Sequence, residues 1–360
     1  MSKLKLLGLL PAYYGGGAEK VMLMYFNKNQ NELLSFKLFV SNASGPLKYK
    51  FNQNNIEFRH KRFLYSIPKL LEEIKKNKIN VLFSTFPNIS VIIILLKLLR
   101  LHKCAIIVRQ PNELEKSLSG SLKLSFLKFL YTKIIHKSDL IIVTSRYMKK
   151  EVYALNKKIK NIHLIRNPVN VKEIRTRVSP AATNKNIIRL IFVGRLVYQK
   201  GIDIVLNVIG NVIGLELIIL GDGKERRNLK RIVKEKCLGN KVSFLGFVDN
   251  PNNLIAGADY FILPSRWEGL PNSVLESLAL GTPVIAFNRI NGLKDYKNKL
   301  EKNSIIFCLN EKDLEKKLNK LKKRSDYNKP KLRKNLLKEF SNPMQYQVKL
   351  NTAILKLNEK

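Results

Sequence analysis

The sequence predicts an α/β protein made of two domains, each built on a doubly wound parallel β-sheet. Short apolar runs alternate with segments of helix length along the whole chain. Near-continuous apolar runs of this kind are typical of parallel strands that helices cover on both faces. The chain has 360 residues, enough for two domains of ordinary size. These observations favour two domains over one large α/β domain.

A proline-containing polar segment divides the predicted strands into two series. It holds Pro168, Pro180 and the stretch 179–186, so we expect the interdomain linker at 166–187. Apolar residues of 344–357 are spaced mostly like one helix face, which predicts a helix packed on a domain. The predicted domains are 1–167, 168–340 and a C-terminal helical segment, 341–360. The predicted strands are 3–10, 81–85, 104–109, 140–145, 188–194, 215–221, 260–265 and 283–287.

The charge balance is strongly basic. Lys and Arg number 66 against 27 Asp and Glu, a formal net charge of +39. Such a field attracts polyanions, so nucleic acid, anionic lipid headgroups and phosphorylated substrates are candidate partners. Lys, Asn and Ile are abundant together, so a compositional bias without a partner is the alternative explanation.

Cysteine usage and hydropathy predict a cytoplasmic protein. The three cysteines are widely spaced and form no Cys-x-x-Cys pair, which fits a reducing compartment. The longest apolar region, 91–101, carries Lys97 and Arg100 and is too short to span a bilayer. The apolar N-terminus is expected to be a first strand rather than a signal peptide. Attachment to a membrane surface stays open.

A glycine cluster follows the first predicted strand. Gly16 and Gly17 stand just before a helix that we expect to begin near residue 18. Glycines let the backbone approach a ligand, and a helix N-terminus offers N–H groups to an anion. The cluster is not G-x-G-x-x-G and lacks the acidic residue of a dinucleotide site. A flexible turn is the alternative.

Two cations follow the predicted strand 188–194. Arg195 comes directly after it, and Lys200 stands just before the next helical pattern. Ligands in doubly wound sheets bind beyond the carboxyl ends of strands, where both residues fall. Arg grips two phosphate oxygens and Lys adds a mobile charge, so the pair suits a diphosphate. Two solvated surface cations are the alternative.

The stretch SRWEGLPNSVLESLALGTPV, residues 265–284, sets two acids around a turn that opens an apolar helix. The acids are Glu268 and Glu276. Gly269, Leu270 and Asn272 are expected to direct N–H groups towards a phosphate or sugar oxygen. The alternative is a capping box, Ser273-x-x-Glu276, in which Glu276 only satisfies a backbone N–H. That alternative leaves Glu268 unexplained.

Six motifs in order resemble the retaining glycosyltransferases of family 4. The resemblance is strongest over 165–287, the half that binds the donor in that family. It implies the GT-B fold, two facing Rossmann-like domains with a C-terminal helix that returns to the N-terminal, acceptor-binding domain. The motifs are GGGAEKV (15–21), NPVN (167–170), GRLVYQKG (194–201), LGDGKERRNL (220–229), GFVDN (246–250) and LPSRWEGLPNSVLESLALGTPVIA (263–286).

The resemblance assigns roles around a nucleotide diphosphate sugar. Arg195 and Lys200 would hold the diphosphate, Glu276 the ribose and Glu268 the transferred sugar. It implies no metal and no cofactor. Arg195, Lys200 and Glu268 are the predicted catalytic residues. The other predicted donor-binding residues are Gly16, Gly17, Gly246, Phe247, Val248, Gly269, Leu270, Pro271, Asn272 and Glu276.

The N-terminal half departs from the family at one position. Many relatives carry a His where VRQPNE, residues 108–113, has Arg109 and Gln110. We expect Arg109 or Glu113 to orient the acceptor, and an ordinary loop after a strand is the alternative.

A basic amphipathic segment, residues 117–137, favours a lipid-linked acceptor. Its lysines are interleaved with Leu, Phe and Ile, which suits an anionic bilayer. An ordinary helix packed on the sheet is the alternative. The expected reaction is retaining transfer of a hexose or N-acetylhexosamine, with UDP favoured on family frequency. The acceptor would be lipid-linked or a polysaccharide, at the inner face of a bacterial membrane, for lipopolysaccharide, O-antigen or capsule.

Two other functions remain alternatives. A nucleic-acid-binding protein would explain the charge, but no known nucleic-acid module appears, and no nucleic-acid partner is expected. A Rossmann-type NAD-dependent enzyme is disfavoured by the missing fingerprint.

Overall fold

The computed structural model divides into two compact units, and the α/β prediction is confirmed. The first unit comprises Met1–Pro168 and Pro343–Lys360, and the second comprises Val169–Asn342. The structure describes residues 3–28, 31–50, 55–118, 121–171, 174, 187–297, 299–300, 303–323 and 342–357. The predicted linker, 166–187, falls largely outside the described residues.

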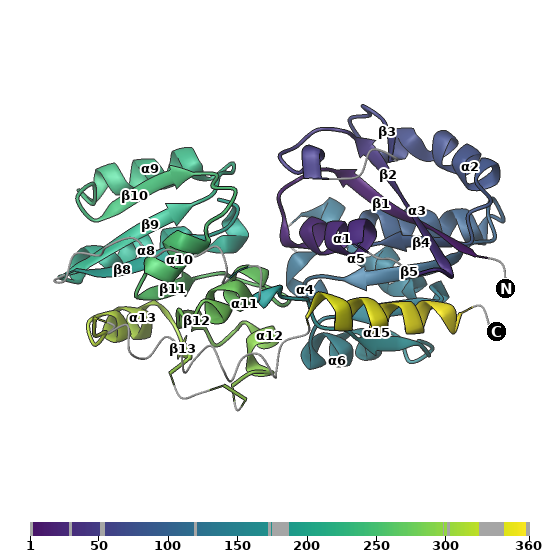
Figure 1. Ribbon diagram of the computed structural model, residues 1–360. Coiled ribbons are helices and arrows are strands. Elements are labelled where there is room, and N and C mark those ends of the chain that lie inside the picture. Colours follow the sequence, from purple (N-terminus) through teal and green to yellow (C-terminus); the bar gives the residue numbers. More distant parts are fainter. Residues whose placement is uncertain are drawn as a thin grey trace. The chain divides into compact units, whose positions relative to one another are not determined.

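The first unit holds a seven-stranded parallel sheet with the order β3-β2-β1-β4-β5-β6-β7 (Figure 1). Strand β1, in the interior of the sheet, is buried along nearly its whole length, as its apolar sequence predicts. The strands are β1 (Leu4–Ala12), β2 (Leu34–Asn42), β3 (Ile56–Glu57), β4 (Val81–Ser84), β5 (Ala105–Gln110), β6 (Leu140–Val143) and β7 (Ile162–Leu164). The helices are α1 (Gly17–Lys28), η1 (Lys48–Lys50), η2 (Phe63–Ser66), α2 (Ile67–Lys76), α3 (Pro87–Leu98), α4 (Leu114–Ser117), α5 (Leu122–Ile134), η3 (Ile135–Lys137), α6 (Arg146–Leu155) and α15 (Pro343–Leu355).

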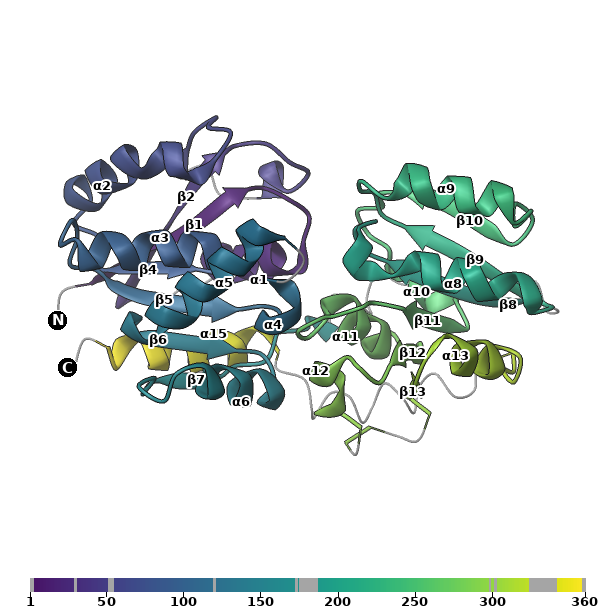
Figure 2. The same ribbon diagram turned by 180° about the vertical axis from the view of Figure 1, so that it is seen from behind.

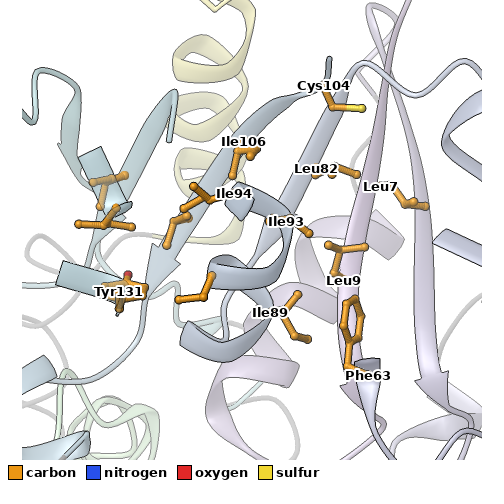
Figure 3. Packing of buried hydrophobic residues seen from close by; sticks show 14 of the residues in the cluster. Leu7, Leu9, Phe63, Leu82, Ile89, Ile93, Ile94, Cys104, Ile106 and Tyr131 are labelled. Atoms are coloured by element: carbon orange, nitrogen blue, oxygen red, sulfur yellow. The ribbon is translucent and has the colours of Figure 1, made fainter. Parts of the chain in front are cut away.

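Two apolar clusters cover the two faces of this sheet. One is built with α2, α3, α5 and α6, and Figure 3 shows Ile93 and Ile94 of α3 packing towards Leu82 and Ile106 of the strands. The other is built with α1 and α15. The Tyr25 hydroxyl of α1 donates a buried hydrogen bond of 2.6 Å to the Asn351 Oδ1 of α15. The predicted C-terminal helix is therefore part of the first unit's core.

The second unit holds a six-stranded parallel sheet with the order β10-β9-β8-β11-β12-β13. Helices α8, α9 and α13 pack on one face, and α10, α11 and α12 on the other. The strands are β8 (Ile188–Val193), β9 (Leu215–Leu220), β10 (Val242–Gly246), β11 (Tyr260–Leu263), β12 (Val284–Phe287) and β13 (Ile305–Cys308). The helices are η4 (Tyr198–Lys200), α8 (Ile202–Val208), η5 (Ile209–Asn211), α9 (Arg226–Glu235), α10 (Asn252–Gly257), α11 (Asn272–Ala279), α12 (Asn291–Lys294) and α13 (Glu311–Leu318).

Candidate active site

A buried ion pair between Lys200 and Glu268 is the centre of the candidate site in the second unit. The Lys200 Nζ lies 2.5 Å from the Glu268 Oε1, and 13% and 6% of the two side chains are exposed. The Ser265 hydroxyl donates a hydrogen bond of 2.8 Å to the same oxygen. The Gln199 amide donates to the Trp267 carbonyl at 2.9 Å. The structure thus brings together a predicted diphosphate ligand and the predicted sugar ligand.

The two loops that carry this pair leave the same edge of the sheet. Lys200 lies in η4 after β8, and Glu268 lies between β11 and α11. Strands β8 and β11 are parallel neighbours, so their carboxyl ends lie side by side. Gly201 permits the close approach of the loops, because its φ is +63° and a Cβ there would lie 2.3 Å from the Pro264 carbonyl oxygen.

A second ion pair fixes the same two loops. The Arg266 guanidinium donates hydrogen bonds of 2.9 and 2.6 Å to the Asp203 carboxylate, which raises the pKa of Arg266. Its Cζ lies 3.9 Å from the centroid of the Tyr198 ring. Sequence analysis missed this pair. Their positions in the sequence could have indicated them, because Arg266 is close to Glu268 and Asp203 is close to Lys200.

Arg195 lies in the same loop as Lys200, and its side chain is exposed. Gly221, with a φ of +128°, lets the turn after β9 pack on this loop, since a Cβ there would lie 1.9 Å from the Gly194 carbonyl oxygen. The Leu196 N–H donates to the Asp222 carbonyl at 2.9 Å. Within the described ranges, no hydrogen bond or ion pair holds the Arg195 guanidinium, so it can turn towards a ligand.

The segment Gly246 to Val248 follows β10 and lies beside the Gly221 turn. The Gly221 N–H donates to the Gly246 carbonyl at 2.6 Å. Phe247 is exposed, while Val248 packs on the apolar cluster of this unit. The structure therefore places this predicted donor-binding segment next to the loop of Arg195.

Helix α11 begins at Asn272, with Pro271 at the N-cap and no side-chain cap. Glu276 is the fifth residue of the helix and is half-buried. The capping-box alternative is therefore wrong, because the helix begins before Ser273 and Glu276 lies past the capping position.

Residues from the β12–α12 region support the start of α11. Gly269 and Leu270 are buried, and a Cβ at Gly292 would lie 1.8 Å from the Gly269 carbonyl oxygen. The Arg289 Nε donates to the Ser265 carbonyl at 3.3 Å, and burial lowers the pKa of Arg289. Sequence analysis missed Gly292 and Arg289. Arg289 follows β12, so the rule that ligands bind beyond strand ends was the signal for it.

Gly16 and Gly17 lie in the first unit, where β1 passes into α1. Gly17 is the first residue of α1, one residue before the predicted start of the helix. Gly16 is buried against the Glu19 carboxylate, and a Cβ at Gly16 would lie 2.4 Å from the Glu19 Oε2. Glu19 itself is 3% exposed. A side chain at position 16 would therefore displace the Glu19 carboxylate.

Arg109 is fully buried near the carboxyl end of β5. Its Nη2 donates a hydrogen bond of 2.5 Å to the Asn167 Oδ1. Burial lowers the pKa of Arg109, and the Tyr346 hydroxyl and the Glu19 carboxylate oppose that shift. In the described part of the chain, its Nε and Nη1 have no hydrogen-bond partner. A buried guanidinium with two unpaired atoms is a candidate ligand for an anion.

Glu113 is also buried, but it has a partner of its own. Its carboxylate lies 3.1 Å from the Lys116 Nζ, one turn further along α4. The structure thus gives Arg109 and Glu113 separate partners.

In the parts of the chain that the structure describes, no group of three or more His, Cys, Asp or Glu side chains is placed to bind a metal ion. The described helices include none with the length and apolar character required to span a bilayer.

Comparison with known proteins matches the second unit to one family. Residues 172–339 match the family model described as Glycosyl transferases group 1. An uncharacterized glycosyltransferase of Methanocaldococcus jannaschii is 27% identical over 69% of this chain and 63% of its own length. The chain thus spans less than two thirds of that relative. A Campylobacter jejuni protein, GalNAc-alpha-(1->4)-GalNAc-alpha-(1->3)-diNAcBac-PP-undecaprenol alpha-1,4-N-acetyl-D-galactosaminyltransferase, is 26% identical over 88% of each chain.

The fold of the whole chain is that of solved glycosyltransferase structures. Anabaena HepE in complex with UDP and glucose matches with a TM-score of 0.79 and 14% identity, over 98% of this chain and 100% of that one. At this identity the likeness shows the fold alone, two Rossmann-like domains of the GT-B type. Residues 172–339 are thus similar to the glycosyl transferases of group 1, and the chain has the GT-B fold.

Proposed function

We propose that the protein is a retaining glycosyltransferase of family 4 that builds bacterial cell-surface glycan. It would move a hexose or N-acetylhexosamine from a nucleotide diphosphate sugar, preferably a UDP-sugar, to a lipid-linked or polysaccharide acceptor. The observation that carries this proposal is the buried Lys200–Glu268 pair where β8 and β11 end. Two similar proteins support it. The HepE structure contains UDP and glucose. The name of the Campylobacter jejuni protein includes an undecaprenol-linked substrate.

The cations of the β8–α8 loop suit the donor diphosphate. Among the described residues, the Arg195 guanidinium has no side-chain or backbone partner, so it can donate two parallel hydrogen bonds to phosphate oxygens. Lys200 is mostly buried, so its charge acts on a bound phosphate with little screening by water. When the diphosphate enters, Lys200 would exchange the Glu268 carboxylate for a phosphate oxygen. The Gly246–Val248 segment would lie near the base.

The two carboxylates suit hydroxyl groups. Glu268 would accept hydrogen bonds from the transferred sugar once Lys200 turns to the phosphate. The Ser265 hydroxyl donates a hydrogen bond to the Glu268 carboxylate and so helps to hold it in place. Glu276 is half-buried and does not cap helix α11, so its carboxylate would accept hydrogen bonds from the ribose hydroxyls. The first turn of α11, approached by Gly269 to Pro271, would face phosphate or sugar oxygens.

The chemistry follows from these positions. The bond between the anomeric carbon and the β-phosphate oxygen breaks, and its electron pair goes to the leaving phosphate. Arg195 and Lys200 stabilise the negative charge that develops there. The acceptor hydroxyl oxygen bonds to the anomeric carbon on the same face, and its proton passes to the leaving phosphate. No protein base, metal or other cofactor is required by this route.

We assign the acceptor to the first unit. The unpaired Nε and Nη1 of Arg109 suit an anionic group on the acceptor, such as a diphosphate. Glu113 would act beside it, and Gly16 and Gly17 are assigned to donor binding by the family resemblance alone. The protein would work in the cytoplasm, at the inner face of the membrane.

A thermal-shift panel tests this function. UDP-, GDP- and ADP-sugars are compared with NADH and a short RNA. The correct donor at 100 times its Kd should stabilise the fold by about 2.7 kcal/mol. Stabilisation by one nucleotide sugar, lost in Lys200→Met, is expected. A flat response to every nucleotide sugar from folded protein, or a shift with NADH or RNA alone, would overturn the proposal.

A further inference from the structure

Helix α5 presents large apolar side chains to solvent. Leu122, Phe126 and Phe129 are 91%, 63% and 55% exposed. They follow the spacing i, i+4, i+7, so they share one helix face. Another face packs on the core of the first unit through Leu127, Leu130, Tyr131 and Ile134. The amphipathic pattern of the sequence thus contains two apolar faces, and the core covers only one of them.

Helix α3 is the neighbour of α5 in the first unit. Figure 2 shows α3 and α5 side by side. Both helices pack on the same face of the sheet, so their outer sides point in the same general direction. At its carboxyl end, α3 exposes Leu98 and is followed by the exposed Leu99. Lys97 pairs with Asp139 at 2.7 Å, so these two leucines lie towards the carboxyl end of α5. We therefore call Leu122, Phe126 and Phe129 alone the α5 face.

Lysines surround the α5 face, and acids are missing from its sequence. Residues 116–138 contain no Asp or Glu. Lys123, Lys133 and Lys137 are exposed. The Lys133 Nζ lies 5.7 Å from the centroid of the Phe129 ring. Long lysine stems can lie along apolar surface while their ammonium groups reach outward to anionic headgroups.

The positive charge around the α5 face indicates which kind of partner it would bind. A second copy of the chain would place these lysines against their own equivalents, and like charges at an interface are unfavourable. An anionic bilayer supplies both an apolar layer for Phe126 and Phe129 and negative charge for the lysines. We infer that the α5 face docks on the surface of an anionic membrane. This inference does not depend on the proposed transferase activity.

Vesicle flotation with the full chain tests the inference. Wild-type protein should float with phosphatidylglycerol-containing vesicles at low salt, and less as salt rises. Phe126→Ser/Phe129→Ser should weaken binding by about 10- to 100-fold, since two aromatic side chains no longer insert. Lys123→Glu/Lys133→Glu/Lys137→Glu should remove the salt-sensitive part of binding. Neutral phosphatidylcholine vesicles should bind far less.

A matched control removes equal exposed apolar surface elsewhere. Ile213→Ser/Leu309→Ser changes residues of the second unit that are 93% and 71% exposed. This control should float like wild type, and the melting temperatures of all variants should agree with that of wild type. Three results would overturn the inference: no wild-type flotation at low salt, equal flotation of the Phe126→Ser/Phe129→Ser variant, or a dimer that this variant dissociates without changing flotation.

A spectroscopic readout adds a test of insertion. Phe126→Trp should shift its emission to shorter wavelength when anionic vesicles are added, because the indole enters an apolar layer. Ile213→Trp is the control and should not shift. Trp267 is the single native tryptophan and contributes the same background to both variants. Equal spectra for Phe126→Trp with and without vesicles would contradict docking through this face.

Discussion

The Lys200 Nζ and the Glu268 Oε1 lie 2.5 Å apart, in loops that follow two neighbouring parallel strands. Buried partners of this kind depend on each other for stability, because removal of one leaves the other charge uncompensated. In the proposed mechanism they separate when the donor binds. Stability and activity should therefore respond differently to substitution of the pair.

A single and a double substitution separate the effect of the pair on stability from its effect on activity. Lys200→Met should lower the free energy of unfolding by about 3–5 kcal/mol, because the Glu268 carboxylate stays buried without its partner. Lys200→Met/Glu268→Gln should regain much of that loss. Activity should fall by about 100-fold or more in both variants, since the phosphate loses its cation. Equal destabilisation in the single and double variants, measured by urea unfolding, would contradict the coupling.

Gly201 should be intolerant of a side chain. Gly201→Ala places a Cβ 2.3 Å from the Pro264 carbonyl oxygen at a φ of +63°. We expect a loss of about 1–3 kcal/mol in unfolding free energy and lower activity, because η4 and Lys200 must shift. Gly239→Ala is the matched control, since a Cβ there meets nothing within 4 Å. Similar melting temperatures for the two variants would count against this account.

Glu276→Gln tests whether this acid binds ligand. Glu276 lies past the cap of α11, so the change should alter unfolding free energy by less than about 0.5 kcal/mol. Donor affinity, measured by calorimetry, should fall by about tenfold or more, since a charged acceptor for the ribose hydroxyls is lost. Unchanged affinity would remove Glu276 from the site.

His102 should make stability sensitive to acid. Its Nδ1 accepts the Cys104 N–H at 3.2 Å and its Nε2 lies 2.9 Å from the Ile93 carbonyl oxygen, so the ring is neutral with the proton on Nε2. Burial lowers the pKa of His102 in the folded state. The unfolded chain then binds more protons below its ordinary pKa of about 6.5, so stability falls as pH drops from there towards the folded pKa.

The change is followed as melting temperature against pH in wild type and His102→Gln. The variant should lose part of this acid-dependent decrease. His163, whose pKa burial also lowers, accounts for another part. Parallel curves for the two proteins would show that His102 does not titrate in this window.

Thiol labelling should find one reactive cysteine. Cys237 is exposed, whereas Cys104 and Cys308 are buried and burial raises the pKa of each to about 11. The native protein at pH 8 should therefore react with one equivalent of a thiol reagent, and Cys237→Ser should abolish that reaction. All three thiols should react after denaturation. Fast labelling of native Cys237→Ser would contradict the packing around the other two.

Much of the fold follows from the order of apolar runs. All eight predicted strands are present, because a strand buried on both faces must be apolar at nearly every position. In the described parts of the chain, five further strands were missed. Strand β10 alternates buried and exposed residues, and β3 and β7 have only two and three residues, so none gives a continuous apolar run. Strand β13, Ile305–Cys308, was missed although it is apolar at every position. Strand β2 contains polar residues among the apolar ones.

The sequence by itself predicted part of the candidate site. Arg195, Lys200 and Glu268 were selected by their places after apolar runs and by a family motif, and both signals are local along the chain. Only the tertiary structure decided their partners. The Lys200–Glu268 pair, the Arg266–Asp203 pair and the contact of Gly292 with Gly269 join segments that are separated in sequence.

Helix α5 also shows the difference between what the sequence predicts and what the tertiary structure adds. Its sequence shows lysines and apolar residues in a helical pattern, but not which apolar residues the sheet covers. The structure buries Tyr131 and leaves Leu122 and Phe126 exposed, because the sheet and α3 contact only one side of the helix. Periodicity along a chain determines a helix and its faces, whereas burial depends on neighbours that the chain brings from elsewhere.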